Sequence, residues 1–169
     1  MTVNSFAAER LIELVAQRVA GAASTDWFDA LCVFDDELSS RGSGAQTTAV
    51  VASVDGSRIV GASVGDSSAW LISLAGEVTD LTVNQRRRPL LGSGEALPVI
   101  FETGLNGGRL LLATDGLVKY ASVEEICTLA THGSVAAAVD AVANCARLPS
   151  GALQDDVAVV LVSENMNWQ

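Results

Sequence analysis

The chain has 169 residues, a length that fits one domain. Hydrophobic residues make up 49% of it and charged residues 18%, so the sequence is too apolar for intrinsic disorder and long enough to bury a core. Acidic residues outnumber basic ones by 20 to 10, which gives a formal net charge of −10 and a pI near 4.3. This charge argues against partners such as nucleic acid or an anionic membrane surface, because both would repel the protein.

No uninterrupted apolar run reaches the ~20 residues that a membrane-spanning helix requires. The first twenty residues carry charges throughout and lack the apolar core and cleavage site of a signal peptide. We therefore expect a soluble, cytoplasmic protein. Three cysteines, Cys32, Cys127 and Cys145, form neither an even disulfide set nor a C-x-x-C metal motif, and we expect them to be buried as small apolar side chains.

The first forty residues predict two helices, because apolar residues recur there at helical spacing. Gly21 ends the first helix, and a Gly- and Ser-rich stretch over 39–44 ends the second. The first helix is expected to be capped at its N-terminus by Asn4 or Ser5, and the second by Ser24 or Thr25. Within the second helix the acidic run 35–37 is expected to form a solvated face.

From residue 46 onward the pattern changes to strands. The runs 47–54 and 58–64 are rich in β-branched residues and are joined by Asp55-Gly56, a dipeptide suited to a hairpin turn. With 69–74 and 77–82 they are expected to form one antiparallel meander of four strands. The remaining expected elements are, in chain order, strands over 98–102 and 109–114, helices over 122–131 and 134–147, and a strand over 156–162. This order indicates an α+β fold in which helices cover antiparallel sheet.

Several catalytic schemes are excluded by the inventory of side chains. The sequence holds one histidine, His132, which is expected to cap a helix end, so a Ser-His-Asp triad is not supported. Its one lysine, Lys119, does not lie in a phosphate-binding P-loop motif. None of the cysteines precedes an arginine in a Gly-rich turn, as a thiol phosphatase would require.

What remains is a set of aspartates at the ends of predicted strands. Asp66 and Asp115 follow strands, and Asp155 and Asp156 directly precede one. If these strand ends meet at one edge of the sheets, their carboxylates would repel one another unless a hard cation such as Mg²⁺ or Mn²⁺ lay between them. The alternative, which stays open on spacing alone, is that each aspartate serves its own turn or cap.

Four segments, in this order along the chain, resemble successive motifs of the metal-dependent protein serine/threonine phosphatases of type 2C. The family patterns are roughly G-x-T-A, V-G-D-S-R, L-x-x-S-D-G-L and D-(N/D)-(I/V)-T. The matching segments of this chain are GAQTTAVVA (44–52), VGDSSAWLI (64–72), LLLATDGL (110–117) and QDDVAVVLV (154–162). Together with the flanking pattern the resemblance covers about residues 4–163.

The resemblance implies two antiparallel β-sheets packed face to face with helices on the outer faces, in a single phosphatase-like domain over 1–169. It also implies hydrolysis of phosphoserine or phosphothreonine in proteins by a water activated on Mg²⁺ or Mn²⁺. By motif match, Asp115 and Asp155 fall on metal-ligand positions, and Asp66 falls near an additional, looser metal. The residues expected to lie directly around these ligands are Asp156, Gly65 and Gly116.

The chain also departs from the family pattern. It has neither the R-x-x-N-(E/Q)-D motif nor the D-G-M-G-G motif, which in the family supply a phosphate-binding arginine and further metal ligands, so the fold is expected to be truncated at its N-terminus. Ser68 stands where the family has the arginine of G-D-S-R. The basic cluster Arg86-Arg87-Arg88 is a candidate phosphate contact, or alternatively a solvated loop that relieves the acidic field.

Three interpretations remain. The first is a metal-dependent phosphatase whose activity is impaired by missing ligands. The second is a non-catalytic phosphatase-like module that binds and regulates a phosphoprotein or another partner. The third is that Met1 is internal to a longer natural protein whose preceding part carries those ligands. The missing strands would leave sheet edges exposed, which favours either this third interpretation or a homodimer in which a second copy covers the edges.

Overall fold

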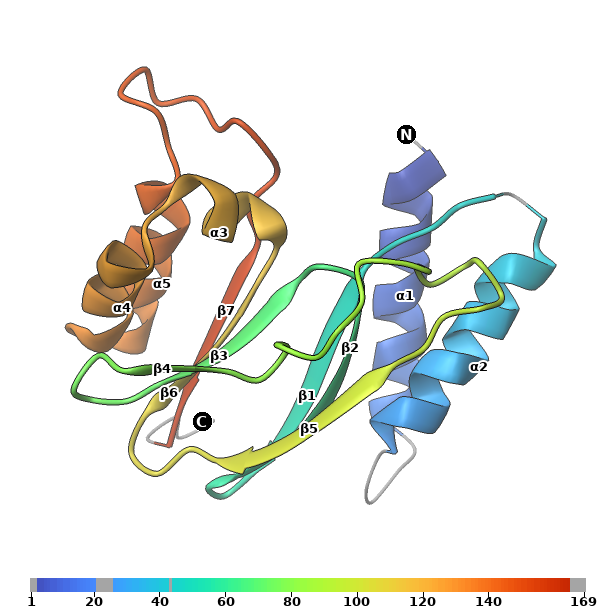
Figure 1. Ribbon diagram of the computed structural model, residues 1–169, viewed down its shortest axis with the longest axis horizontal. Helices are drawn as coiled ribbons and strands as arrows, with labels where there is room; N and C mark the ends of the chain where they lie inside the picture. Colours follow the sequence, from blue (N-terminus) through green and yellow to red (C-terminus); the bar gives the residue numbers. More distant parts are fainter. Residues whose placement is uncertain (1–2, 21–25, 43, 165–169) are drawn as a thin grey trace. The chain divides into compact units, whose positions relative to one another are not determined.

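A computed structural model describes residues 3–20, 26–42 and 44–164. The chain forms two compact units, each of which contains one β-sheet and its helices (Figure 1). The first unit comprises the chain up to Ser53 with 60–66 and 84–102, and the second comprises 54–59, 67–83 and the chain from Thr103. That the chain is one domain stays a prediction. Within the described ranges, no helix is long and apolar enough to span a bilayer.

The first unit holds a three-stranded sheet, in the order β1-β2-β5, and two helices. Its elements are α1 (Val3–Ala20), α2 (Trp27–Ser40), β1 (Ala49–Asp55), β2 (Arg58–Val64) and β5 (Val99–Gly104). The expected hairpin of β1 and β2 is present, and the chain reverses at Gly56, whose φ of +56° is one that glycine adopts without strain. Side chains of both helices and of the sheet share one core, to which α2 contributes Trp27, Leu31 and Phe34.

The helix starts differ from the expected ones. Asp26 caps α2: its carboxylate accepts hydrogen bonds from the backbone N–H groups of Phe28 at 3.0 Å and Asp29 at 3.2 Å. The expected caps Ser24 and Thr25, like Gly21, lie outside the described residues. The other expected caps were wrong, because α1 already includes Asn4 and Ser5.

Asp35 corrects the expectation that the acidic run of α2 is a solvated face. Its side chain is buried, and it accepts hydrogen bonds from the backbone N–H groups of Gly92 at 2.6 Å, Gly94 at 3.1 Å and Ala96 at 2.8 Å. A buried carboxylate is tolerated when such donors surround it. Asp35 therefore anchors the loop over 92–96 to α2, and of the three acidic residues only Asp36 is exposed.

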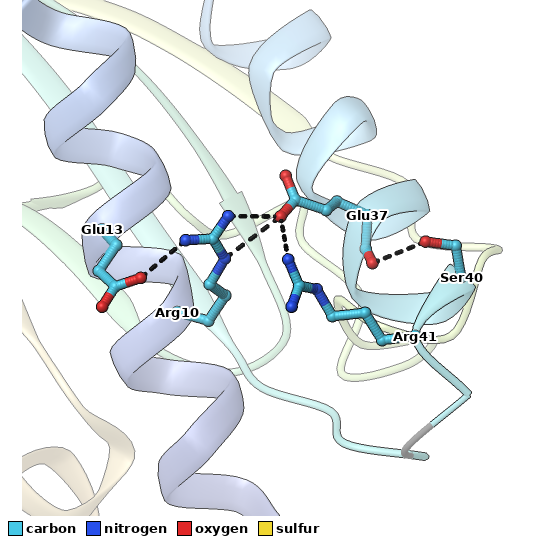
Figure 2. Close-up of polar contacts among 5 residues, drawn as sticks. All are labelled: Arg10, Glu13, Glu37, Ser40 and Arg41. Carbon is cyan, nitrogen blue, oxygen red and sulfur yellow. Dashed lines mark hydrogen bonds and ion pairs between the residues drawn. The ribbon is translucent and has the colours of Figure 1, made fainter.

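Glu37 joins the two helices of the first unit. Figure 2 shows Arg10 of α1 and Arg41, just beyond α2, converging on the same carboxylate oxygen, at 2.7 and 2.8 Å. The other end of the Arg10 guanidinium contacts Glu13 at 2.7 Å. The hydrogen bond from Arg10 is the main cause that lowers the pKa of Glu37, and Arg41 adds to it.

The second unit holds a four-stranded antiparallel sheet, in the order β4-β3-β6-β7, and three helices. Its elements are β3 (Ser68–Ile72), β4 (Val78–Asp80), β6 (Arg109–Ala113), α3 (Asp115–Tyr120), α4 (Val123–Thr131), α5 (Val135–Cys145) and β7 (Val159–Ser163). The expected meander of four consecutive strands was wrong, since β1 and β2 belong to one sheet and β3 and β4 to the other. Strand periodicity reports which residues alternate but not which strands pair.

The core of the second unit is built from one side of the sheet and from its helices. Trp70, Leu111 and Leu161 of the sheet pack in the same cluster as Ile126 of α4 and Val142 of α5. Ser122 caps the N-terminus of α4, as expected: its hydroxyl oxygen accepts a hydrogen bond from the Glu125 N–H at 3.1 Å. With two antiparallel sheets and helices, the expected α+β class is confirmed.

Candidate functional site

The candidate site begins where β6 ends in the second unit. Thr114 has extended backbone and joins the strand to α3, whose first residue is Asp115. The Thr114 hydroxyl donates to the Asp156 carbonyl and accepts from the Ala158 N–H, both at 3.0 Å, and its own N–H donates to the Ala158 carbonyl. These bonds extend the β6–β7 pairing by one step. They hold the two Asp-containing segments side by side at one end of the sheet.

Gly116 explains the A-T-D-G pattern of this turn. A Cβ atom placed on it would lie 2.4 Å from the Asp156 carbonyl oxygen and 3.2 Å from Asp155 Cβ. Only glycine lets the first turn of α3 approach the segment before β7 this closely. Asp115 and Asp155, which were expected at strand ends, therefore lie on adjacent segments, one at the start of α3 and one before β7.

Lys119 occupies the space between these two aspartates. It lies four residues after Asp115 on α3, contacts the Asp115 carboxylate directly, and places its Nζ 3.6 Å from Asp155 Oδ2. The other oxygen of Asp155 accepts from the Asp156 N–H at 2.9 Å. Side-chain exposure is 29% for Asp115 and 44% for both Asp155 and Lys119, so the cluster lies at the surface and is open to solvent.

The residues of this cluster do not fit a two-metal centre. The cation that balances Asp115 and Asp155 is the Lys119 ammonium of the chain itself. Two metal ions with a bridging oxygen need several acidic ligands aimed at one point. Among the residues that the structure describes, no three His, Cys, Asp or Glu side chains converge in that way. Metal binding by Asp115, Asp155 and Asp66 stays a prediction.

Lys119 is the residue of this site that sequence analysis missed. An Asp and a Lys four residues apart face one another on a helix, and this spacing is the signal that could have revealed the pair. Sequence analysis predicted no element between the strand over 109–114 and the helix over 122–131. The structure has the six-residue helix α3 there.

Asp66 and Gly65 lie in the first unit, at the end of β2. Gly65 has a φ of +99°, and a Cβ there would lie 2.6 Å from the Thr48 methyl group and 3.2 Å from a methyl of Leu90. Glycine at this position is thus required by conformation and by packing. Asp66 is half-buried, while Asp156, expected beside the metal ligands, is exposed.

The basic cluster of the sequence also lies in the first unit. Arg86, Arg87 and Arg88 are all exposed. They precede Pro89, and the chain then enters the loop that Asp35 anchors. Their role as phosphate contacts stays a prediction.

The cysteines and the histidine have structural roles. Burial is the main cause that raises the pKa of the Cys32, Cys127 and Cys145 thiols, which keeps them in the unreactive thiol form. Cys127 is buried as expected, whereas the other two are half-buried. His132 is the C-cap of α4, as expected, with its Nδ1 2.6 Å from the Thr128 carbonyl oxygen.

Comparison with protein-family models finds no match, and neither does comparison with curated protein sequences. Solved structures do match. A bacterial serine phosphatase that bears a point mutation has a TM-score of 0.71 and 23% identity, over 80% of this chain and 64% of that one. A serine/threonine phosphatase from Staphylococcus aureus has a TM-score of 0.77 and 20% identity, over 90% of this chain and 75% of that one.

A third match is the catalytic domain of the serine/threonine protein phosphatase PstP in complex with two manganese ions. Its TM-score is 0.75 at 21% identity, over 93% of this chain and 80% of that one. The chain thus spans between about two thirds and four fifths of these phosphatases. At such identities the likeness concerns the fold, and this chain has the fold of the bacterial serine/threonine phosphatases of type 2C.

Proposed function

We propose that this chain is a non-catalytic phosphatase-like module that binds and regulates a partner protein. The observation that carries the proposal is the position of Lys119, whose ammonium contacts Asp115 and lies 3.6 Å from Asp155. These are the two aspartates that by motif match stand on metal-ligand positions. A monovalent ammonium neutralises carboxylates but supplies no coordinated water, so this arrangement favours a binding role over hydrolysis.

The partner we expect is a phosphoprotein, because the fold is that of phosphatases that act on serine and threonine residues. The expected mode of action is competition or sequestration: a module that holds a phosphorylated segment without cleaving it shields that segment from other enzymes. A homodimer that covers open sheet edges stays a prediction of the sequence.

A second candidate function is metal-dependent hydrolysis of phosphoserine or phosphothreonine. It is favoured by the likeness to the PstP catalytic domain, whose structure contains two manganese ions. Under this candidate Mg²⁺ or Mn²⁺ would be held by Asp115 and Asp155, with Asp66 near an additional metal by motif match, and Lys119 would have to leave the two carboxylates that it contacts.

Hydrolysis of p-nitrophenyl phosphate separates the two candidates. We expect the purified chain with Mn²⁺ to show no rate above that of its Asp115→Asn variant, since neither protein forms a metal-activated water. Circular dichroism of both proteins would establish that they are folded. A rate that requires Mn²⁺ and disappears in Asp115→Asn would overturn the proposal and establish the enzyme.

A further inference from the structure

Most cations of this acidic protein have partners within the chain. Those with hydrogen bonds or ion pairs to named groups are Arg10 and Arg41 on Glu37, Arg109 on the carbonyls of Ala130 and Gly133, Lys119 on Asp115, and Arg147 on Asn144 and the Gly151 carbonyl. Arg58 also has a partner.

Three consecutive arginines behave differently. Arg86, Arg87 and Arg88 are exposed, and within the described part of the chain none of their guanidinium groups makes an ion pair or a side-chain hydrogen bond. The sequence contains 20 acidic residues with which they could pair. Three adjacent like charges repel one another unless an anion lies among them. The anion that these arginines would bind is therefore one from outside the chain.

The segment that follows the arginines is held firmly. Leu90 packs beside Gly65, and the fully buried Leu91 exchanges backbone hydrogen bonds with Thr47 at 3.0 and 3.1 Å. Directly afterwards, the N–H groups of Gly92, Gly94 and Ala96 donate to the buried Asp35 carboxylate. The backbone that follows the arginines is thus held by hydrogen bonds before any ligand binds, which lowers the conformational entropy lost on binding.

A phosphate monoester suits this arrangement. It carries close to two negative charges and three acceptor oxygens at neutral pH, and arginine pairs with it through two parallel N–H···O bonds. A long polyanion suits it less. With a net charge of −10, the protein as a whole would repel the further phosphates of a nucleic acid or of an anionic bilayer.

We propose that Arg86, Arg87 and Arg88 form a docking site for a phosphorylated serine or threonine segment of a partner protein. The proposal deepens the proposed function by naming the group that is recognised, and it rests on that function only for the consequence of binding, which is regulation of the partner.

Fluorescence polarisation with a labelled mixture of short peptides tests the site directly. The peptides carry a central phosphoserine between randomised residues, and EDTA is present throughout so that metal-dependent turnover plays no part. We expect saturable binding that weakens about tenfold or more when all three arginines are replaced by glutamine, because charge-assisted hydrogen bonds are lost. Arg18→Gln is the matched control, since Arg18 is an exposed arginine of α1, and it should change the affinity less than twofold.

Three outcomes would overturn the docking site. The first is equal binding of the phosphoserine mixture and of the same mixture with plain serine. The second is an affinity that the triple glutamine variant, verified as folded by circular dichroism, leaves unchanged. The third is a preference for another anion. It would be shown by inorganic phosphate that competes as effectively as phosphopeptide, or by arginine-dependent binding to a DNA oligonucleotide or to phosphatidylserine vesicles that is tighter than binding to the phosphopeptides.

The peptide-binding measurement and the hydrolysis assay test the docking site and the non-catalytic function separately. Arginine-dependent peptide binding in EDTA, together with Mn²⁺-dependent hydrolysis, would refute the non-catalytic function and support the docking site. The reverse pair of results, no hydrolysis and no arginine-dependent binding, would refute the docking site and support the non-catalytic function.

Discussion

At the scale of single residues, Lys119 determines the charge of the cluster at the start of α3. Asp115 and Asp155 together carry two negative charges, and the one ammonium of Lys119 lies against both of them. Without that ammonium the two carboxylates would lack the counter-charge that they share, and a divalent cation could take its place. The same lysine therefore stabilises the cluster and opposes the entry of a metal ion.

Replacing Lys119 should expose a weak cation site. We expect Lys119→Ala to bind Mn²⁺ about tenfold or more tightly than the unchanged chain, because a positive charge next to the carboxylates is removed. Lys119→Arg keeps that charge and is the matched control, in which affinity should stay at the original level. Isothermal titration calorimetry measures both. Adding Asp115→Asn to Lys119→Ala should abolish the gain, and equal Mn²⁺ affinity in all these proteins would contradict the assignment of the two aspartates.

Asp35 is the residue on which the ordered loop of the first unit depends. In Asp35→Asn one acceptor oxygen becomes an NH₂ donor that opposes backbone N–H groups, so we expect a loss of about 1–3 kcal/mol in the free energy of unfolding. Urea denaturation followed by circular dichroism gives this value. Asp36→Asn alters the exposed neighbour and should stay within about 0.5 kcal/mol. Similar losses in the two variants would show that Asp35 does not anchor the loop.

At the scale of elements, the ion pairs around Glu37 attach α1 to α2. The two helices also share apolar core residues, among them Leu11 and Leu14 of α1 and Leu38 of α2. Figure 2 shows these ion pairs between the two helices, and their side chains are partly exposed, at 22% for Arg10, 31% for Glu37 and 44% for Arg41. Their contribution depends on pH, because the Arg10 and Arg41 hydrogen bonds lower the pKa of Glu37 in the folded chain.

The direction of this pH dependence follows from the lowered pKa. The folded chain keeps Glu37 ionised at a pH where the unfolded chain protonates it, so the stabilisation is complete above the ordinary glutamate pKa of about 4.3 and is lost as pH falls through the lower, folded value. We expect Glu37→Gln to reduce stability by about 0.5–1 kcal/mol at pH 7, with a difference that narrows toward pH 3. Thermal unfolding from pH 3 to 7 measures this difference. Glu13→Gln should have a smaller effect, and a Glu37→Gln difference that is constant with pH would contradict the assignment.

At the scale of the whole molecule, the distribution of charge distinguishes cation binding by the aspartate cluster from phosphopeptide binding by the arginines. The excess of ten negative charges repels polyanions, while the arginine cluster at 86–88 provides one local point of positive charge. The aspartate cluster around Lys119 belongs to the second unit and the arginines to the first. This is why metal binding and phosphopeptide binding are tested by separate variants.

Much of the fold was predictable from local patterns. Strand runs such as 58–64, the reversal at Gly56 and the Ser122 cap of α4 were predicted, because alternation, turn chemistry and capping act between residues close in sequence. The α+β class and the likeness to type 2C phosphatases also followed from the order of these elements and motifs. The four-stranded meander was predicted wrongly, because strand pairing is decided by contacts that alternation does not encode.

The candidate site was predictable in part. Asp115 and Asp155 were singled out by their positions next to apolar strands, and β6 and β7 do pair so that both carboxylates lie near the Lys119 ammonium. The roles of Lys119 and Asp35 were not predicted. Each depends on partners brought close by folding: Asp155 lies far along the chain from Lys119, and the loop over 92–96 lies far from Asp35. Composition and periodicity thus sufficed for the elements and the motif-bearing residues, whereas charge balance and burial at each carboxylate were decided by the tertiary structure, since both depend on the groups that fold against it.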